Sequence, residues 1–229
     1  MDSSLARPRI KDHMVEVIAV TDLTPWYRRL AMDAKGLFDS YTPDPGAYLH
    51  LNVPVGASTL PRSYSIHNIT PETFQLDFVL HTPSGPGCEW AAAAEPGTTI
   101  SVSEPPYSLN IPEASHALII ADPSALAAAI SILESVDHRM KVMVLLEDEH
   151  PDRDQIPIPT RGNIVWLDTI DEDVMELATA HLNRHDCFLW AAGERRLAKT
   201  VREFARTEFK VPRNAQHIQT YWIARGRQE

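Results

Sequence analysis

The sequence predicts a two-domain protein in which an N-terminal antiparallel β-barrel precedes an α/β domain with a parallel sheet. Three observations lead to this prediction: short strand-like segments between Pro, Gly and Asn turns in the first half, alternating strand-like and helix-like segments in the second, and a proline-rich stretch at residues 105–112. A chain of 229 residues can bury two cores. We therefore place the domains at residues 1–112 and 113–229.

The first half contains several segments of strand length that are rich in β-branched and aromatic residues. They lie at residues 14–20, 48–53, 74–80 and 98–102. In the third, an apolar side chain occupies every second position from Phe74 to Leu80, which is the period of a strand with one buried face. Short strands at such regular spacing favour a small antiparallel barrel.

The second half changes period. Apolar runs typical of buried strands lie at residues 117–121, 142–146, 164–167 and 188–192. Helix-like segments lie at residues 124–136, 173–181 and 195–209. Strands that alternate with helices predict a parallel sheet with helices on its faces.

Composition excludes several kinds of function. The chain carries 21 Lys and Arg against 31 Asp and Glu, a formal charge of −10, which argues against a general nucleic-acid-binding protein. Cys88 and Cys187 are too few for an iron–sulfur cluster or an all-cysteine zinc site, and we expect no disulfide framework. The ten histidines are scattered, and we expect no metal site. With no apolar signal core and no membrane-length apolar run, we expect a cytoplasmic, soluble protein without membrane insertion. We also expect a monomer.

The charge is unevenly distributed along the chain. Residues 113–186 carry 5 basic and 15 acidic side chains, whereas residues 187–229 carry 9 basic and 4 acidic ones. Part of this basic end is a stripe at helical spacing, formed by Arg195, Lys199, Arg202 and Arg206. One interpretation is a solvated helix face, and the other is electrostatic attraction of an anionic small molecule or a cofactor phosphate.

The stretch Arg62-Ser63-Tyr64-Ser65 follows a predicted barrel strand and combines side chains suited to a flavin. The tyrosine ring can lie against the isoalloxazine face, a hydroxyl can bond its polar edge, and the arginine can pair with the pyrophosphate. Strand alternation puts Arg62 and Tyr64 on one face and Ser65 on the other, so convergence requires a twist or bulge. The alternative is an ordinary surface strand.

A second motif combines residues 77–81 (DFVLH) with residues 85–91 (GPGCEWA). A glycine-rich turn that opens a short helix, here residues 88–94, brings backbone N–H groups and the helix dipole to a phosphate. The alternative is a plain turn in which Trp90 is a core aromatic residue and His81 a polar residue at a strand end.

Together, the patterns Arg-x-Tyr-Ser, Asp-Phe-Val-Leu-His and Gly-Pro-x-x-x-Trp-Ala resemble the siderophore-interacting protein family, FAD-containing ferric-siderophore reductases of the ferredoxin-reductase superfamily. The chain is also similar to this family at residues 119–126 (IIADPSAL), where the family has Asp-x-Thr-Ala-Leu, and at residues 190–194 (WAAGE). The resemblance ends at residues 221–226, with one residue more than the family's terminal Gly-Tyr-Trp-x-x-Gly. It covers residues 13–226.

The resemblance implies the site residues by position. Those that contact FAD are Arg62, Tyr64 and Ser65, with His67 where the family usually has a second arginine. Those that hold its ribityl or phosphate portion are His81, Gly85, Pro86, Gly87, Trp90 and Ala91. Those near the nicotinamide side of the flavin are Asp122, Ser124, Ala125, Glu194 and Trp222. For the anionic iron chelate we favour Arg225 first and Lys199 second.

Three positions depart from the family pattern. His67 is a weaker phosphate partner than arginine at neutral pH, so we expect weaker FAD binding or a shifted pyrophosphate. Pro123 follows Asp122 where an acidic residue is common, and Thr220 replaces a glycine before Tyr221. No Gly-x-Gly-x-x-Gly follows a strand, so we expect weak NAD(P)H binding or another electron donor.

The function implied by the resemblance is reduction of a ferric siderophore, with NADPH or NADH as the donor and FAD as the carrier of the chemistry. No side chain is expected to act as a catalytic acid or base. Two alternatives remain: a general flavin or ferric-chelate reductase without a siderophore role, and a non-enzymatic siderophore- or partner-binding protein that has lost its flavin.

Overall fold

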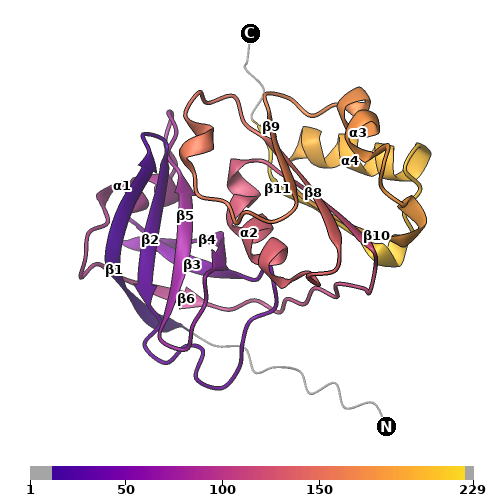
Figure 1. Cartoon of the computed structure of the whole chain (residues 1–229). Coiled ribbons are helices and arrows are strands. Elements are labelled where there is room, and N and C mark those ends of the chain that lie inside the picture. Colours follow the sequence, from indigo (N-terminus) through magenta and orange to yellow (C-terminus); the bar gives the residue numbers. More distant parts are fainter. Residues whose placement is uncertain (1–11, 225–229) are drawn as a thin grey trace. The chain divides into compact units, whose positions relative to one another are not determined.

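The computed structural model describes residues 12–224, and the chain divides between Leu109 and Asn110 into two compact units (Figure 1). The sequence placed the boundary at residues 112 and 113. The first unit is a closed antiparallel barrel and the second contains a parallel five-stranded sheet. The predicted fold class is therefore confirmed.

The barrel has the strand order β1-β2-β5-β4-β3-β6. Its strands are β1 (His13–Thr24), β2 (Tyr27–Asp33), β3 (Tyr48–Val55), β4 (Ser58–His67), β5 (Thr73–Val79) and β6 (Thr99–Ser103). Its one helix within residues 12–109 is α1 (Pro86–Ala93), between β5 and β6. The alternating apolar residues Phe74, Leu76 and Phe78 of β5 belong to the barrel core, as the period of two predicted.

Strand β2 was absent from the sequence prediction, because Arg28 and Arg29 interrupt its apolar pattern. Leu30 and Met32 nevertheless alternate into the core. Arg28 pairs with Asp22 through its Nε and Nη2 atoms at 2.6 and 3.0 Å, and its Nη1 donates to the carbonyls of residues 91 and 92 at 3.1 and 2.8 Å. Those carbonyls end α1, so β2 supplies the cation that fixes this helix on the barrel.

The second unit alternates strands and helices. Its strands are β7 (His116–Ala121), β8 (Lys141–Glu147), β9 (Asn163–Leu167), β10 (Cys187–Glu194) and β11 (Gln216–Trp222), in the order β11-β10-β7-β8-β9. Its helices are α2 (Leu126–Ser135), α3 (Glu172–Thr179) and α4 (Arg195–Thr207), with short 3₁₀ turns at Pro123–Ala125, Arg153–Gln155, Arg184–Asp186 and Arg213–Ala215. All four ladders are parallel.

This sheet has a switch point between β7 and β10. The chain proceeds from β7 to β8 and β9 on one side, then returns to add β10 and β11 on the other. In open α/β sheets, ligands bind outside the carboxyl ends of the strands at such a point. The two sheet residues at this place are Asp122, which follows β7, and Glu194, which ends β10.

Helix α4 covers one face of the sheet. Its residues Leu197, Val201 and Phe204 share a buried cluster with Leu118 and Ile120 of β7. They repeat at i, i+4 and i+7, the apolar stripe that the sequence predicted for this helix. Because the stripe faces the sheet, the basic side chains at positions 195, 199, 202 and 206 are exposed.

Candidate functional site

Tyr64 of β4 packs between the barrel core and the start of α1. Its ring centroid lies 4.3 Å from that of Phe78, and the Phe78 and Trp90 centroids are 5.8 Å apart. Its hydroxyl touches Gly87 so closely that a Cβ placed on this glycine would lie 2.0 Å from it. Burial raises the pKa of Tyr64 to about 12, so the hydroxyl stays protonated at physiological pH.

The first turn of α1 has backbone donors without acceptors in the helix, on residues Gly87 and Cys88 that are themselves buried. Its N-cap is Gly85, which supplies no side-chain hydrogen bond, and Pro86 has no N–H at the first helical position. The amides of Gly87 and Cys88 lie in the first turn, where no carbonyl of the helix can accept from them. Such a terminus, with the positive end of the helix dipole, is suited to a phosphate.

Strand β4 is paired unequally on its two sides. All of its residues from Ser58 to Ser65 pair with β3. By contrast, only Ile66 and His67 of β4 pair with β5. The part of β4 that contains Arg62 and Tyr64 therefore has no strand partner on the β5 side among residues 12–224. An open edge beside an aromatic ring and an open helix terminus fits an elongated cofactor with a planar ring and a phosphate.

The residues of the Arg62–Ser65 motif do not converge as side chains. The β3–β4 register has no shift, so Tyr64 and Ser65 point to opposite sides of the strand. Ser65 is buried, and the Nη1 atom of the half-buried Arg62 donates to the carbonyl of Pro61 at 2.9 Å. No bulge brings the three together, and a bond from Ser65 to the flavin therefore remains a proposal.

His67 lies in a buried ionic cluster. Its Nε2 atom is 3.2 Å from Asp77 Oδ2, without hydrogen-bond geometry, and only 2% of the residue is exposed. Arg29 donates to both oxygens of Asp77 at 2.7 Å, and Tyr27 Oη lies 3.3 Å from Oδ2. Burial alone would raise the pKa of Asp77, but Arg29 and His67 outweigh it and lower the pKa. His67 therefore has almost no surface with which to contact a phosphate.

The remaining residues proposed for the barrel divide into two kinds. His81 is exposed, and its Nδ1 atom lies 2.7 Å from the carbonyl oxygen of Pro83. Ala91 is fully buried in the barrel core, and the partly buried Trp90 packs against this core. His81 is thus accessible to a ligand, whereas Ala91 places α1 on the barrel.

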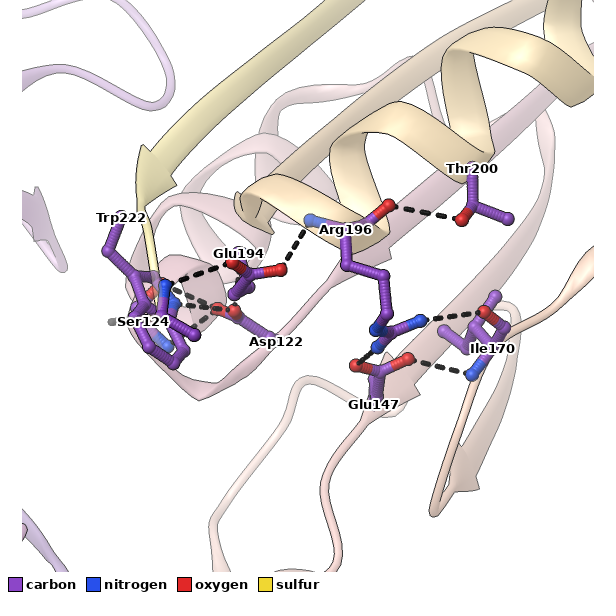
Figure 2. Close-up of polar contacts among 9 residues, drawn as sticks. Asp122, Ser124, Glu147, Ile170, Glu194, Arg196, Thr200 and Trp222 are labelled. Carbon is purple, nitrogen blue, oxygen red and sulfur yellow. Dashed lines mark hydrogen bonds and ion pairs between the residues drawn. The ribbon is translucent and has the colours of Figure 1, made fainter. Parts of the chain in front are cut away.

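In the second unit, the proposed residues Asp122, Ser124, Glu194 and Trp222 meet at the carboxyl edge of the sheet (Figure 2). Asp122 is 6% exposed, and its Oδ2 accepts from the backbone N of Glu194 at 2.7 Å and from Trp222 Nε1 at 2.9 Å. Its Oδ1 accepts from Ser124 N at 2.9 Å and Ser124 Oγ at 2.5 Å. Burial raises the pKa of Asp122, against the effect of these donors. Ala125, in the same turn, is fully buried.

Glu194 extends this network to α4 and β8 (Figure 2). Its Oε2 accepts from the backbone N of Arg196, which caps α4, and its Oε1 accepts from the backbone N of Ala224 at 3.0 Å. Arg196 in turn pairs with Glu147 at the end of β8. Glu147 begins a segment rich in carboxylates, residues 147–154 (EDEHPDRD), which we name the acidic loop.

The structure describes one of the two residues proposed for the iron chelate. Lys199 is exposed on α4. Arg225 lies outside the described residues. Within residues 12–224 no group of three or more His, Cys, Asp or Glu side chains is placed to hold a metal ion.

Sequence reasoning assigned no role to three residues that shape these regions, although two of them lie within the motifs at residues 77–81 and 190–194. Phe78 supports the ring of Tyr64, Arg29 neutralises Asp77, and Gly193 lies against the Asp122 carboxylate. Gly193 has a φ of 151°, and its signal in the sequence was its place before Glu194 in the motif at residues 190–194.

Comparison with known proteins places both units in one family. Residues 114–225 match the model of the siderophore-interacting protein family, and residues 50–109 match that of the siderophore-interacting FAD-binding domain. Among the described residues, no helix has both the length and the apolar character of a membrane span.

Three individual proteins illustrate the relationship. The mycobactin import ATP-binding/permease protein IrtA of Mycobacterium tuberculosis is 32% identical over 226 residues, which are 93% of this chain and 26% of that protein. The ferric vibriobactin reductase ViuB of Vibrio cholerae is 29% identical over 74% of this chain and 66% of its own length. The crystal structure of a siderophore utilization protein from T. fusca superposes with a TM-score of 0.80 at 23% identity, covering 94% of both chains. The chain thus spans about a quarter of the length of IrtA.

Proposed function

The chain belongs to the siderophore-interacting protein family, and on this basis we propose that it is an FAD-dependent reductase that passes electrons from NADH or NADPH to a ferric siderophore. FAD is its cofactor, since residues 50–109 match the FAD-binding domain model. One observation carries the proposal: Tyr64, on the open edge of β4, lies against Gly87 at the uncapped first turn of α1.

The residues of the barrel bind and orient the cofactor. Tyr64 offers a ring held by Phe78, the first turn of α1 offers amides for a phosphate, and Arg62 offers the guanidinium for the pyrophosphate. With His67 buried beside Asp77, Arg62 alone is left to supply that charge from β4. When bound, FAD supplies the redox chemistry by accepting a hydride and releasing electrons one at a time. No side chain needs to act as an acid or base.

The substrate class follows from charge and from iron chemistry. Fe(III) chelated by hard oxygen donors forms anionic complexes, and the exposed basic stripe of α4 provides the complementary charge, with Lys199 as its central residue. Oxygen chelators hold Fe(II) far less tightly than Fe(III), so reduction releases the metal for assimilation. We place this reaction in the cytoplasm, where Cys88 and Cys187, both free, remain reduced.

The first experiment tests for the flavin and for its reduction. The purified full chain is mixed with FAD and desalted, and the bound flavin is measured by its visible absorption. We expect stoichiometric binding, and reduction of a ferric siderophore by NADH or NADPH, followed with a colorimetric Fe(II) chelator. A chain that retains no flavin would exclude the enzyme and leave the non-enzymatic binding protein. Turnover of ferric citrate without turnover of siderophores would favour the general ferric-chelate reductase.

A second experiment tests the placement of the substrate. We expect Lys199→Ala to lower kcat/KM for an anionic ferric siderophore about two- to fivefold, the effect of one exposed charge, with bound flavin unchanged. Lys141→Ala is the matched control, because Lys141 is also exposed but begins β8 at the opposite, amino edge of the sheet. Equal rates for the two variants would contradict the placement.

A further inference from the structure

A buried carboxylate, Asp122, holds a half-exposed tryptophan at the carboxyl edge of the parallel sheet. The indole Nε1 of Trp222 donates to Asp122 Oδ2 at 2.9 Å, although 47% of Trp222 is exposed and Asp122 is 6% exposed. Asp122 follows β7 and Trp222 ends β11, and these strands are not neighbours, since β10 lies between them. The indole therefore reaches across one whole strand to its partner (Figure 2).

Two features of the backbone make this reach possible. In the β10–β11 ladder Gly193 pairs with Thr220 and Glu194 with Trp222, so Tyr221 is an extra residue that forms a bulge. A bulge redirects the side chains that follow it, here that of Trp222. Between the two side chains lies Gly193, on which a Cβ would stand 2.7 Å from the Asp122 carboxylate carbon. Glycine at this position leaves the space in which the carboxylate sits.

The remaining contacts of Asp122 fix the carboxylate itself. Ser124 donates to Oδ1 through its backbone N and its Oγ, and Glu194 donates to Oδ2 through its backbone N. These donors hold the Asp122 carboxylate in one orientation, and the fixed carboxylate in turn restricts the rotamers of the Trp222 indole. An exposed tryptophan at the end of a strand otherwise exchanges between rotamers, which a ligand would have to restrict on binding.

We propose that Asp122 is a positioning residue that holds the indole of Trp222 as a preformed flat surface for a planar, electron-poor heteroaromatic ring. This step rests on the proposed function, in which two such rings occur: the nicotinamide of the electron donor and the isoalloxazine of the flavin. Preorganisation lowers the entropy lost on stacking, so the hydrogen bond contributes to affinity without contacting the ring.

The positioning is tested on the apoprotein by the exchange of indole hydrogens. The chain has five tryptophans, and Trp222→Phe assigns the Trp222 signal in a spectrum of ¹⁵N-labelled indoles. We expect its Nε1–H to exchange at least about tenfold more slowly than that of a free indole, despite the exposed ring. Asp122→Ala should abolish this protection, whereas Ser124→Ala should preserve it because it removes one donor to the other oxygen. An unprotected Trp222 in the wild-type chain would overturn the proposal without any mutation.

The ligand is tested by titrating the apoprotein with nicotinamide mononucleotide and, separately, with flavin mononucleotide. Trp222→Phe keeps an aromatic ring but lacks the N–H, so we expect it and Asp122→Ala to weaken the same one of the two ligands, about three- to tenfold. Lys141→Ala, at the amino edge of the sheet, should bind both as the wild type does. Unchanged affinity for both ligands in Trp222→Phe would refute the role as a ring surface. If the wild-type chain does not bind FAD or does not reduce a ferric siderophore, the proposed function is refuted, whereas the result of the exchange experiment still stands.

Discussion

Replacing Gly87 by alanine tests the contact that joins β4 to α1. The added Cβ would lie 2.0 Å from Tyr64 Oη and 3.1 Å from its Cζ. Ordinary contact begins at 3.4 Å, so the hydroxyl or the helix has to move by about 1.4 Å. The tyrosine has little room to do so, because its ring is packed on Phe78 at 4.3 Å.

The expected cost to stability is the balance of two terms. Alanine is preferred over glycine inside a helix by about 1 kcal/mol, whereas overpacking a filled space costs about 1–3 kcal/mol. Gly87→Ala should therefore lower the free energy of unfolding by about 0–2 kcal/mol. FAD affinity should fall further, about three- to tenfold, because the displaced ring is the surface we assign to the flavin.

The assay is a double-mutant cycle in urea unfolding and in FAD titration. Tyr64→Phe removes the oxygen, so in the double variant the nearest contact becomes the ring carbon at 3.1 Å, which needs a shift of a few tenths of an ångström. We expect Tyr64→Phe to rescue most of both losses. In urea unfolding, Gly85→Ala is the control, because its Cβ would have no neighbour within 4 Å. Losses that Tyr64→Phe leaves unrescued, or a loss of stability that Gly85→Ala reproduces, would refute the reasoning.

Three further predictions use other parts of the chain. Arg29→Gln should lower the free energy of unfolding by about 3–5 kcal/mol at pH 7, because it leaves Asp77 buried without the Arg29 cation. Since the pKa of Asp77 is lowered from 3.8, its contribution is lost as the pH falls below that value, and chemical denaturation should show the wild-type advantage shrinking there. Gly162→Ala should lower the free energy of unfolding by about 2–4 kcal/mol, because φ of Gly162 is 77° and the new Cβ would lie 2.5 Å from the Val142 carbonyl oxygen. Gly56→Ala is the control, with a φ of 60° in open space, and should lower it less in the same measurement. NADH should give a higher kcat/KM than NADPH, because the acidic loop repels a 2′-phosphate, and equal values at low salt would contradict this.

The elements that the sequence predicted are those with an uninterrupted period, and the elements that it missed carry polar residues with partners elsewhere. Strand β11 was missed because Gln216, His217 and Gln219 hide its apolar positions. Strand β2 was missed because its two arginines read as surface residues, whereas one fixes the end of α1 and the other neutralises Asp77. For β2 the missing information is the partners of its arginines, the end of α1 and Asp77, which lie far away in the sequence.

The residues of the candidate site also divide into those whose role was visible in the sequence and those whose role depends on tertiary contacts. The residue types suggested that Arg62, Tyr64 and Ser65 act together, which strand alternation allows only with a twist or bulge, but the β3–β4 register contains no shift and Tyr64 and Ser65 point to opposite sides. The importance of Gly87 was visible as a motif, yet its reason, the hydroxyl of Tyr64 against its Cα, required the tertiary structure. His67 looked like a substituted phosphate ligand, whereas its position is that of a neighbour to a buried acid.

The helix caps explain why the second unit can lack a glycine-rich phosphate motif. Asp122 caps the turn before α2, Asp171 caps α3 and Glu194 caps α4, each by accepting from a backbone N–H of the first turn. A carboxylate there occupies the position in which a dinucleotide pyrophosphate would bind, so glycines for close approach would serve no purpose. By contrast, α1 of the barrel has Gly85 at its N-cap and no such carboxylate. Phosphate recognition is therefore expected at the barrel, and the sheet is left to recognise its ligand by charge and by the ring of Trp222.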